Sequence, residues 1–540
     1  MEVLDVVIIG AGPCGLAVAA RLREQTPSAI FSDEEHRRFH WMQRHGKKMP
    51  LRNVKTGRVS CCPIPTAQPE CKMLVLDDSG DGWMARWKRL FRMYDISHLR
   101  SPVLWHVDPR DRDSLLSYAH EMARQDELIE IKGCVGKEVS KHGWKKKAKR
   151  VNGKQNQKID INERDRNDYY NPSRGVFADH CDSVAFRYGL GAELVSRESA
   201  QDIDFGFVNI TTSNDQKLFT VTTNKTRYYA RAVVLAVGPA NAPSIPSIPG
   251  MPPCPAQRPQ TCHSMHITEF PDPLVKERIA AGRETNVLVI GGGLTSAQLS
   301  DLAVRRGVTK VWHLMRGPCR VKHFDVDLCW MHKFRNYEQA RFWLADSDAE
   351  RLEMIKTARG GGSITPVFQK RLRRHVFDGS VELCTHTTMT EARFEDGLIG
   401  GGGVWHVKTE PPIQNLPPMD YIYFATGVNT DFRSLPYLQS MIQQYPVDGC
   451  GGFPCLNDDL MWQDGVPLFV VGKLAALRLG PAAPNLGGAR VGAERIAWAL
   501  EELFTKQGRT SEEAERDSGS DLFSYLSGDG NKFSSLDSGS

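Results

Sequence analysis

The sequence lacks several features that would assign it to common classes of protein. Its 13 cysteines include no C-x-x-C pair, and the closest two, Cys61 and Cys62, are adjacent. No run reaches the roughly 18 consecutive apolar residues that a membrane-spanning helix needs. A basic and apolar leader is also missing, because an apolar strand pattern begins almost at Met1. We therefore expect reduced thiols, a cytoplasmic protein, no metal site and no membrane span.

A strong charge imbalance is also absent. The chain carries 69 Lys and Arg against 64 Asp and Glu, a formal charge of +5, so its electrostatics predict no nucleic-acid partner. Hydrophobic residues make up 41% and charged residues 25%, as in ordinary folded proteins. A chain of 540 residues is too long for one hydrophobic core, so we expect at least two lobes.

The start of the chain, VVIIGAGPCG, places a glycine-rich turn between a buried strand and a helix. Residues 6–9 form a continuous apolar run typical of a parallel strand covered on both faces, and residues 16–22 contain small helix formers. In this context the first glycine permits the turn, the second lets a pyrophosphate approach bare backbone, and the third allows close helix packing. The predicted nucleotide-binding residues are Gly10, Gly12, Pro13 and Gly15.

A carboxylate is expected about 20 residues after the first glycine, where it binds a ribose hydroxyl. The segment SAIFSD reads as a second strand that ends at Asp33, and Glu34 is equally well placed. We predict that one of these two residues contacts the ribose.

A second glycine-rich turn follows in NVLVIGGGLTSAQLSDLA, residues 286–303. Gly291 and Gly293 take the first two motif positions, and Ser296, another small residue, takes the third. The next strand ends in Arg316 where a carboxylate would favour NADH, and a guanidinium fits the 2′-phosphate of NADPH. Two turns predict two nucleotides, the second of them NADPH.

The order of the motifs resembles the two-dinucleotide-binding-domain flavoproteins, in which an NADPH domain is inserted into an FAD domain. RAVVLAVGPANAPSIP, with Gly238, resembles the strand that leads out of the FAD domain. DYIYFATGVNTDF, with Thr426 and Gly427, resembles the family's returning A-T-G segment, and PLFVVGK, with Gly472, resembles the closing FAD strand. The resemblance covers most of residues 1–505 and implies FAD and NADPH as cofactors.

Within this superfamily the chain resembles the class B flavin-dependent monooxygenases, which include the ornithine and lysine N-hydroxylases and the flavin-containing monooxygenases. Disulfide reductases need a closely spaced cysteine pair, which is missing. Ser296, Arg316, the segment HSMHI and the Gly-x-Trp segment with Trp83 all match the monooxygenase branch. The resemblance implies insertion of one oxygen atom from O2 into a small N-, S- or carbonyl substrate through a C4a-(hydro)peroxyflavin, with Trp83 beside the flavin.

Two departures from the family pattern stand out. The Phe and Gly of the Baeyer-Villiger fingerprint are missing around Gln257 and Pro259. Lys473 stands where FAD enzymes often have an Asp that contacts the cofactor.

We predict an α/β fold with two Rossmann-like domains and a helical cap. The expected FAD domain comprises 1–245 and 416–505, with the NADPH domain at 246–415 and a disordered tail at 506–540. The cap is placed at about 40–135, and a mobile basic insertion at about 141–173.

Three functions stay open at this point. A monooxygenase is favoured, but an NADPH oxidoreductase or oxidase that reduces a quinone, a protein partner or oxygen needs the same two turns. A non-catalytic regulator of the oxidative-stress growth-inhibitor type shares the fold. The sequence identifies neither the substrate nor a catalytic residue.

Overall fold

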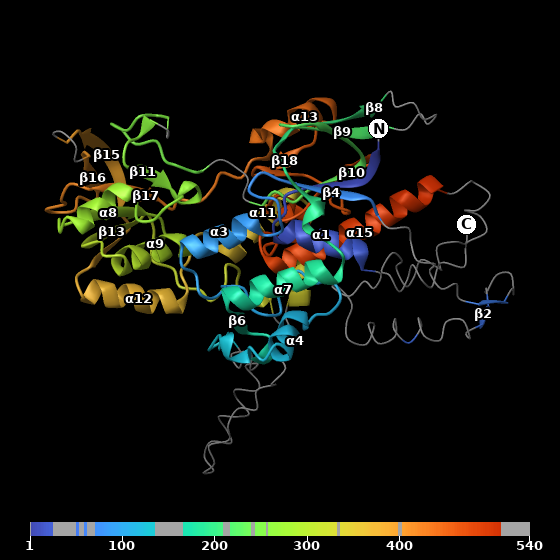
Figure 1. Cartoon of the computed structure of the whole chain (residues 1–540), viewed down its shortest axis with the longest axis horizontal. Helices are drawn as coiled ribbons and strands as arrows, with labels where there is room; N and C mark the ends of the chain where they lie inside the picture. Colours follow the sequence, from blue (N-terminus) through green and yellow to red (C-terminus); the bar gives the residue numbers. More distant parts are fainter. Residues whose placement is uncertain are drawn as a thin grey trace, which may run out of the picture.

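Two lobes, each built on its own sheet, make up the computed structural model (Figure 1). The structure describes residues 2–24, 41, 50–52, 59–61, 71–134, 166–208, 217–238, 243–254, 257–331, 335–397 and 402–508. In these parts of the chain no helix is both long and apolar enough to cross a bilayer.

The first lobe is built on an eight-stranded sheet whose main path runs β20-β21-β10-β1-β4-β7. Five of its strands are parallel: β1 (Val3–Ile9), β4 (Met73–Asp77), β7 (Val195–Arg197), β10 (Arg227–Leu235) and β21 (Val466–Val470). The others are antiparallel to their neighbours: β8 (Ala200–Phe207), β9 (Lys217–Thr223) and β20 (Met461–Gln463). Helices α1 (Pro13–Arg23) and α15 (Leu486–Gly508) pack against each other in this lobe.

The second lobe contains a five-stranded parallel sheet in the order β11-β17-β12-β13-β14. Its strands are β11 (Thr261–His263), β12 (Asn286–Ile290), β13 (Lys310–Met315), β14 (Val381–Thr385) and β17 (Tyr421–Phe424). The lobe also holds α8 (Pro273–Ala280), α9 (Leu294–Arg305), α12 (Pro366–Phe377) and the hairpin of β15 (Thr388–Glu395) and β16 (Val404–Glu410). All of these elements lie between β10 and β20 in sequence, so the second sheet is an insertion into the first lobe.

The predicted fold class, α/β with two Rossmann-like domains, is confirmed. The boundary at residue 416 is placed too early, because β17 pairs with β11 and β12 in the second sheet. An apolar strand shows the same pattern in either sheet, and its partners are decided by tertiary pairing. The chain returns to the first lobe only after Phe424.

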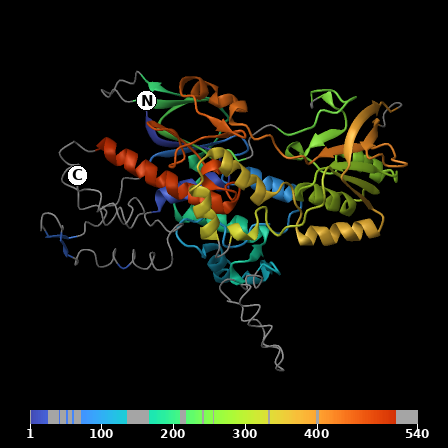
Figure 2. The same cartoon turned by 180° about the vertical axis from the view of Figure 1, so that it is seen from behind.

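The two lobes exchange segments. Residues 324–331 and 335–358, which we call the excursion, contribute Phe324, Trp330 and Phe342 to the core of the first lobe. The excursion contains α10 (Arg335–Trp343) and α11 (Asp348–Arg359), the yellow helices that cross the first lobe in Figure 2. In return, Tyr94 at the end of α3 (Ala85–Met93) is buried in the core of the second lobe. The predicted domain at 246–415 is therefore not one contiguous body.

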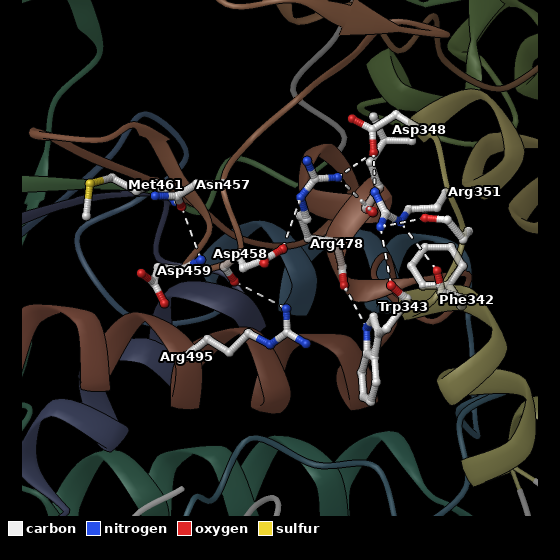
Figure 3. A network of polar contacts seen from close by, with 12 residues as sticks. Phe342, Trp343, Asp348, Arg351, Asn457, Asp458, Asp459, Met461, Arg478 and Arg495 are labelled. Carbon is white, nitrogen blue, oxygen red and sulfur yellow. Dashed lines mark hydrogen bonds and ion pairs between the residues drawn. The ribbon is translucent and has the colours of Figure 1, made fainter. Parts of the chain in front are cut away.

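A polar network holds the excursion on the first lobe (Figure 3). Asp348 at the start of α11 accepts hydrogen bonds from Arg351 at 2.8 Å and from Arg478 at 2.5 Å. Arg478 belongs to α14 (Ala476–Leu479), and its carbonyl oxygen accepts from the indole of Trp343 at 3.2 Å. The network therefore joins α10 and α11 to α14 of the first lobe.

The stretch predicted as a helical cap, about 40–135, contains α3, α4 (Ser114–Glu121) and β5 (Leu128–Glu130), but it also contains β4, so its bounds include part of the first sheet. After this stretch, β6 (Tyr170–Pro172) pairs with β5, and α7 (Arg174–Arg187) contacts α4. β6 lies within the stretch predicted to be a mobile insertion, but Tyr169 and Pro172 are buried and the strand pairs with β5. The predicted insertion therefore extends too far, and its residues 141–165 lie outside the described residues. The remaining elements are β2 (Pro50–Arg52), β3 (Val59–Cys61), α13 (Gln439–Gln444), β18 (Gly449–Cys450) and β19 (Phe453–Pro454).

Of the predicted tail, residues 506–508 continue α15, and residues 509–540 lie outside the described residues.

Candidate functional site

The first glycine-rich turn follows β1 at the carboxyl edge of the first sheet. Gly10 has φ +111°, and a Cβ there would lie 2.5 Å from the carbonyl oxygen of Ala236 on the neighbouring strand. A Cβ on Gly15 would lie 2.0 Å from the carbonyl oxygen of Gly10. A Cβ on Gly12 meets nothing within 4 Å, and Gly12 caps α1, whose first residue is Pro13. The first and third glycines therefore permit close packing, and the second presents bare backbone at a helix N-terminus, which suits a phosphate.

Other predicted residues lie at the same edge. The backbone N–H of Val471, beside Gly472, donates to the carbonyl oxygen of Leu235 at 3.0 Å. A Cβ on Gly472, where φ is +81°, would lie 3.2 Å from Sγ of Cys14 in α1. Gly238 follows β10 with φ +56° and has no neighbour within 4 Å of its Cβ position. Parallel pairing thus brings Gly10, Gly238 and Gly472 to one edge.

Trp83 is buried in the segment next to the first turn. Its indole N–H donates to the carbonyl oxygen of Leu190 at 3.0 Å. The next residue, Met84, donates its backbone N–H to the carbonyl oxygen of Ala11 at 2.8 Å. The Gly-x-Trp segment therefore lies against the glycine turn.

Among the described residues, Asp77 is an acidic residue beside the first turn, and the spacing rule does not select it. Asp77 ends β4, the strand next to β1, and its carboxylate accepts from the backbone N–H of Ala11 at 2.7 Å and of Ser79 at 2.7 Å. Asp33 and Glu34 lie outside the described residues. The segment MLVLDD shows the pattern of a buried strand followed by carboxylates, which would have pointed to Asp77. It lies far beyond the expected spacing from Gly10.

A half-buried cation lies just past the first edge. Lys473 follows Gly472, and burial, together with the charge of Arg359, lowers the pKa of its ammonium group. Such a pair of cations is stabilised by an anion between them. Lys473 therefore fits a cofactor phosphate at this edge, although an Asp is usual at its position in FAD enzymes.

The second glycine-rich turn repeats the geometry of the first. A Cβ on Gly291 would lie 2.3 Å from the carbonyl oxygen of Ala425, whereas one on Gly293, which caps α9, meets nothing within 4 Å. Ser296 is fully buried, and its hydroxyl donates to the carbonyl oxygen of Gly293 at 2.7 Å. A Cβ on Gly362 would lie 3.1 Å from backbone atoms of Gly292 and Gly293. Gly362, in the glycine-rich segment ARGGGSITPVF, thus packs against the second turn.

The side chain of His313 on β13 forms a hydrogen bond with the second turn. Its imidazole is fully buried between the carbonyl oxygen of Gly291, at 2.9 Å from Nε2, and the hydroxyl of Ser300, at 3.1 Å from Nδ1. A carbonyl only accepts, so Nε2 carries the proton and Nδ1 accepts from Ser300. Burial lowers the pKa of His313 to about 4.

We expect acid to destabilise the protein through His313. In the unfolded chain a histidine has a pKa of about 6.5, so between pH 6.5 and 4 the unfolded state binds a proton that the native state refuses. The free energy of unfolding therefore falls as the pH falls, by roughly 3 kcal/mol for this group over the whole window. Urea unfolding of the native protein and of His313→Gln, which keeps a donor and an acceptor but does not titrate, measures the difference. Equal pH slopes in the two proteins contradict this assignment.

Cationic side chains follow β13 beyond the second turn. Arg316 and Arg320 are exposed, and within the described parts of the chain neither forms an ion pair. Lys322 is instead paired with Asp327 at 2.8 Å and donates to the carbonyl oxygen of Arg359 at 3.1 Å. The two free arginines are therefore the available partners for a second-nucleotide phosphate.

Thr426 and Gly427 lie where the two connections between the lobes run side by side. The hydroxyl of Thr426 donates to the carbonyl oxygen of Ser244, and the N–H of Ser244 donates to the carbonyl oxygen of Gly427 at 2.9 Å. Pro243 and Val428 form an antiparallel bridge. The A-T-G segment thus belongs to the paired connections between the lobes.

No cluster of three or more His, Cys, Asp or Glu side chains that could hold a metal ion occurs in the described ranges.

These features define the class of fold: an α/β protein in which a second Rossmann-like domain is inserted into the first. No family model matches the chain, and no curated protein matches it in sequence. Solved structures with this fold do match over nearly their whole length.

One similar structure is the ornithine N-hydroxylase of Kutzneria sp. 744, solved with reduced FAD, NADP+ and L-ornithine. It has a TM-score of 0.59 and 15% sequence identity, and the match covers 93% of this chain and 99% of that one. The reduced ornithine hydroxylase of Pseudomonas aeruginosa has a TM-score of 0.56 and 15% identity, with 93% and 99% covered. The L-lysine 6-monooxygenase of Pseudomonas syringae has a TM-score of 0.55 and 15% identity, with 92% and 99% covered. The chain therefore has the fold of the N-hydroxylating monooxygenases.

Proposed function

We propose that this protein is an FAD- and NADPH-dependent monooxygenase that acts on a small nucleophilic substrate. The observation that carries the proposal is that Gly12 and Gly293 each leave free space where a Cβ would stand. Gly12 caps the N-terminus of α1, and Gly293 caps that of α9. Each offers bare backbone and a helix dipole to a pyrophosphate. The similarity to the fold of N-hydroxylases supports the same conclusion.

The residues around each turn fit the proposed nucleotides. For FAD, the turn at Gly12 would hold the pyrophosphate, Asp77 the adenosine ribose and Lys473 a phosphate oxygen. For NADPH, the turn at Gly293 would hold the pyrophosphate and Arg316 the 2′-phosphate. Bound FAD would supply the oxygen chemistry, and the protein would orient both nucleotides and exclude water.

The substrate class follows from the neighbours in fold. Two of them act on ornithine and one on lysine, and a cadaverine monooxygenase of Erwinia amylovora has a TM-score of 0.54. We propose a primary amine as the first substrate class to test, with sulfides and ketones as the alternatives.

The test is a measurement of NADPH oxidation by the FAD-loaded protein with amines, sulfides and ketones. A monooxygenase forms oxygenated product in proportion to NADPH consumed. NADPH consumption that yields only hydrogen peroxide or a reduced quinone identifies an oxidase or reductase. A protein that binds no flavin and consumes no NADPH is a non-catalytic regulator, which overturns the proposal.

We expect Arg316→Ala to weaken NADPH binding about tenfold, which is 1.4 kcal/mol, and to leave NADH binding unchanged. The guanidinium would contact only the 2′-phosphate, which NADH lacks. Titration of both nucleotides checks this, with Arg320→Ala as a second variant. Arg393→Ala, an exposed arginine on β15 of the same lobe, is the matched control. Equal losses for NADPH and NADH contradict the assignment.

A further inference from the structure

Arg100 lies where the excursion crosses between the lobes. The chain leaves the second sheet after β13, passes residues 320–323 and enters the first core at Phe324. It returns through residues 359–364, and the outgoing and returning runs pair with each other. Lys322 N–H donates to the carbonyl oxygen of Ile364 at 3.0 Å, and Ile364 N–H donates to that of Arg320 at 2.9 Å.

The guanidinium of Arg100 binds both runs at this crossing. Its side chain is only 12% exposed, and all three of its nitrogens donate hydrogen bonds. The acceptors are the carbonyl oxygens of Lys322 (3.0 Å), His323 (3.1 Å), Phe324 (2.9 Å) and Ser363 (3.3 Å), the hydroxyl of Ser363 (2.9 Å) and the carboxylate of Asp325.

The first lobe holds Arg100 by its own backbone. Its carbonyl oxygen accepts from the side-chain amide of Asn171 at 3.2 Å. The neighbouring N–H of Leu99 donates to the carbonyl oxygen of Pro172 in β6 at 3.0 Å. Arg100 therefore ties the first lobe to the crossing of the excursion through its side chain, apart from the paired connections at Ser244 and Gly427.

The contacts of Arg100 continue to both glycine turns. Ser363, which it binds, follows Gly362, and Gly362 packs on the backbone of Gly292 and Gly293. Asp325 also lies 3.9 Å from Arg359, whose guanidinium donates to the carbonyl oxygen of Pro481 at 3.0 Å in the first lobe. The positive charge of Arg359 in turn helps to lower the pKa of Lys473, which lies beside the first turn.

From these contacts we infer that Arg100 is a positioning residue that fixes the second glycine turn relative to the first lobe. This inference rests on the proposed function, in which the nicotinamide must meet the flavin across the junction of the lobes. An arginine suits the task because its planar fork spans several acceptors, whereas the single ammonium of a lysine cannot. A displacement of about 1 Å between reacting groups costs on the order of 100-fold in rate.

The first experiment compares Arg100→Lys with the native protein by rapid mixing of the FAD-loaded protein with NADPH under anaerobic conditions. We expect flavin reduction at saturating NADPH to slow by about tenfold or more, because reacting groups are misplaced. The Kd of NADPH should change by less than about threefold, since Arg100 contacts neither predicted nucleotide-binding turn directly. Ser363→Ala, which removes one acceptor, should change the rate in the same direction by less. Arg110→Lys, an exposed arginine of the same segment, is the matched control and should behave as the native protein.

A second measurement needs no activity. Hydrogen exchange at the amides of Lys322 and Ile364 should be faster in Arg100→Lys, whereas exchange in β12 should not change. If the native protein reduces no flavin, the proposed function fails and the exchange data still test the role of Arg100. Unchanged exchange overturns the inference, whether or not reduction slows, because Arg100 then does not fix the crossing. Faster exchange with an unchanged reduction rate also overturns it, because the contact is then structural only.

Discussion

Gly12→Ala is expected to fold normally and to lose FAD, whereas Gly15→Ala is expected to lose the fold of the first turn. The two glycines are three residues apart but have opposite surroundings. A Cβ on Gly12 meets nothing within 4 Å and its φ is −78°, which alanine adopts without strain. A Cβ on Gly15 would lie 2.0 Å from the carbonyl oxygen of Gly10, so α1 must move away from the turn.

The expected magnitudes differ accordingly. For Gly15→Ala, overpacking against backbone costs about 3 kcal/mol of unfolding free energy. For Gly12→Ala, the unfolding free energy should change by less than about 0.5 kcal/mol, as at an open surface site. The methyl group would occupy the space of the pyrophosphate, so the Kd of FAD should rise at least about tenfold, or 1.4 kcal/mol. Urea unfolding of the FAD-free proteins and titration with FAD measure the two effects separately.

Gly293→Ala is the matched control, because Gly293 has the same open surroundings in the second turn. It should weaken NADPH binding and leave FAD binding unchanged. If Gly12→Ala binds FAD as tightly as the native protein, the first turn does not hold the pyrophosphate.

The glycine turns could be predicted from sequence because their requirements are local. Strand, turn and helix follow one another within residues 3–23 and again within 286–305, and each glycine has its own steric reason. Asp77 could not be predicted in this way. β4, the strand that Asp77 ends, lies next to β1 only through tertiary pairing, and residues 25–70 separate it from α1 in sequence. The spacing rule selects Asp33 and Glu34, which lie outside the described residues, so their contact with the ribose stays a prediction.

The exchange of segments between the lobes could not be predicted from the sequence either. Phe324, Trp330 and Phe342 are apolar residues that would suit either core, and only packing assigns them to the first lobe. His313 and Arg100 also show no local signal, since their partners, backbone carbonyl groups among them, come from other segments. The pattern of residue types along a helix or strand predicts which of its faces is buried. It does not predict which other helix, strand or loop packs against that face.

Arg21→Met is expected to destabilise the first lobe by about 3 to 5 kcal/mol, the usual cost of leaving a buried charge without its partner. Nε of Arg21 in α1 donates to the carboxylate of Glu494 in α15 at 2.8 Å, and the two side chains are 7% and 0% exposed. Burial raises the pKa of Glu494, and the charge of Arg21 opposes that rise. The pair joins the helix that carries the first turn to the long helix beside it.

The double variant Arg21→Met with Glu494→Leu should recover most of the lost stability, because neither member of the pair is then left buried without the other. The pH dependence separates this explanation from a simple loss of packing. Without Arg21, Glu494 has a still higher pKa in the native state, so the native state binds a proton that the unfolded state releases. The stability deficit of Arg21→Met should therefore shrink as the pH falls from 8 to 5, where Glu494 becomes neutral in the folded protein. A deficit that is the same at both pH values, and a double variant no more stable than the single one, would show that Arg21 acts only through its methylene contacts with α15.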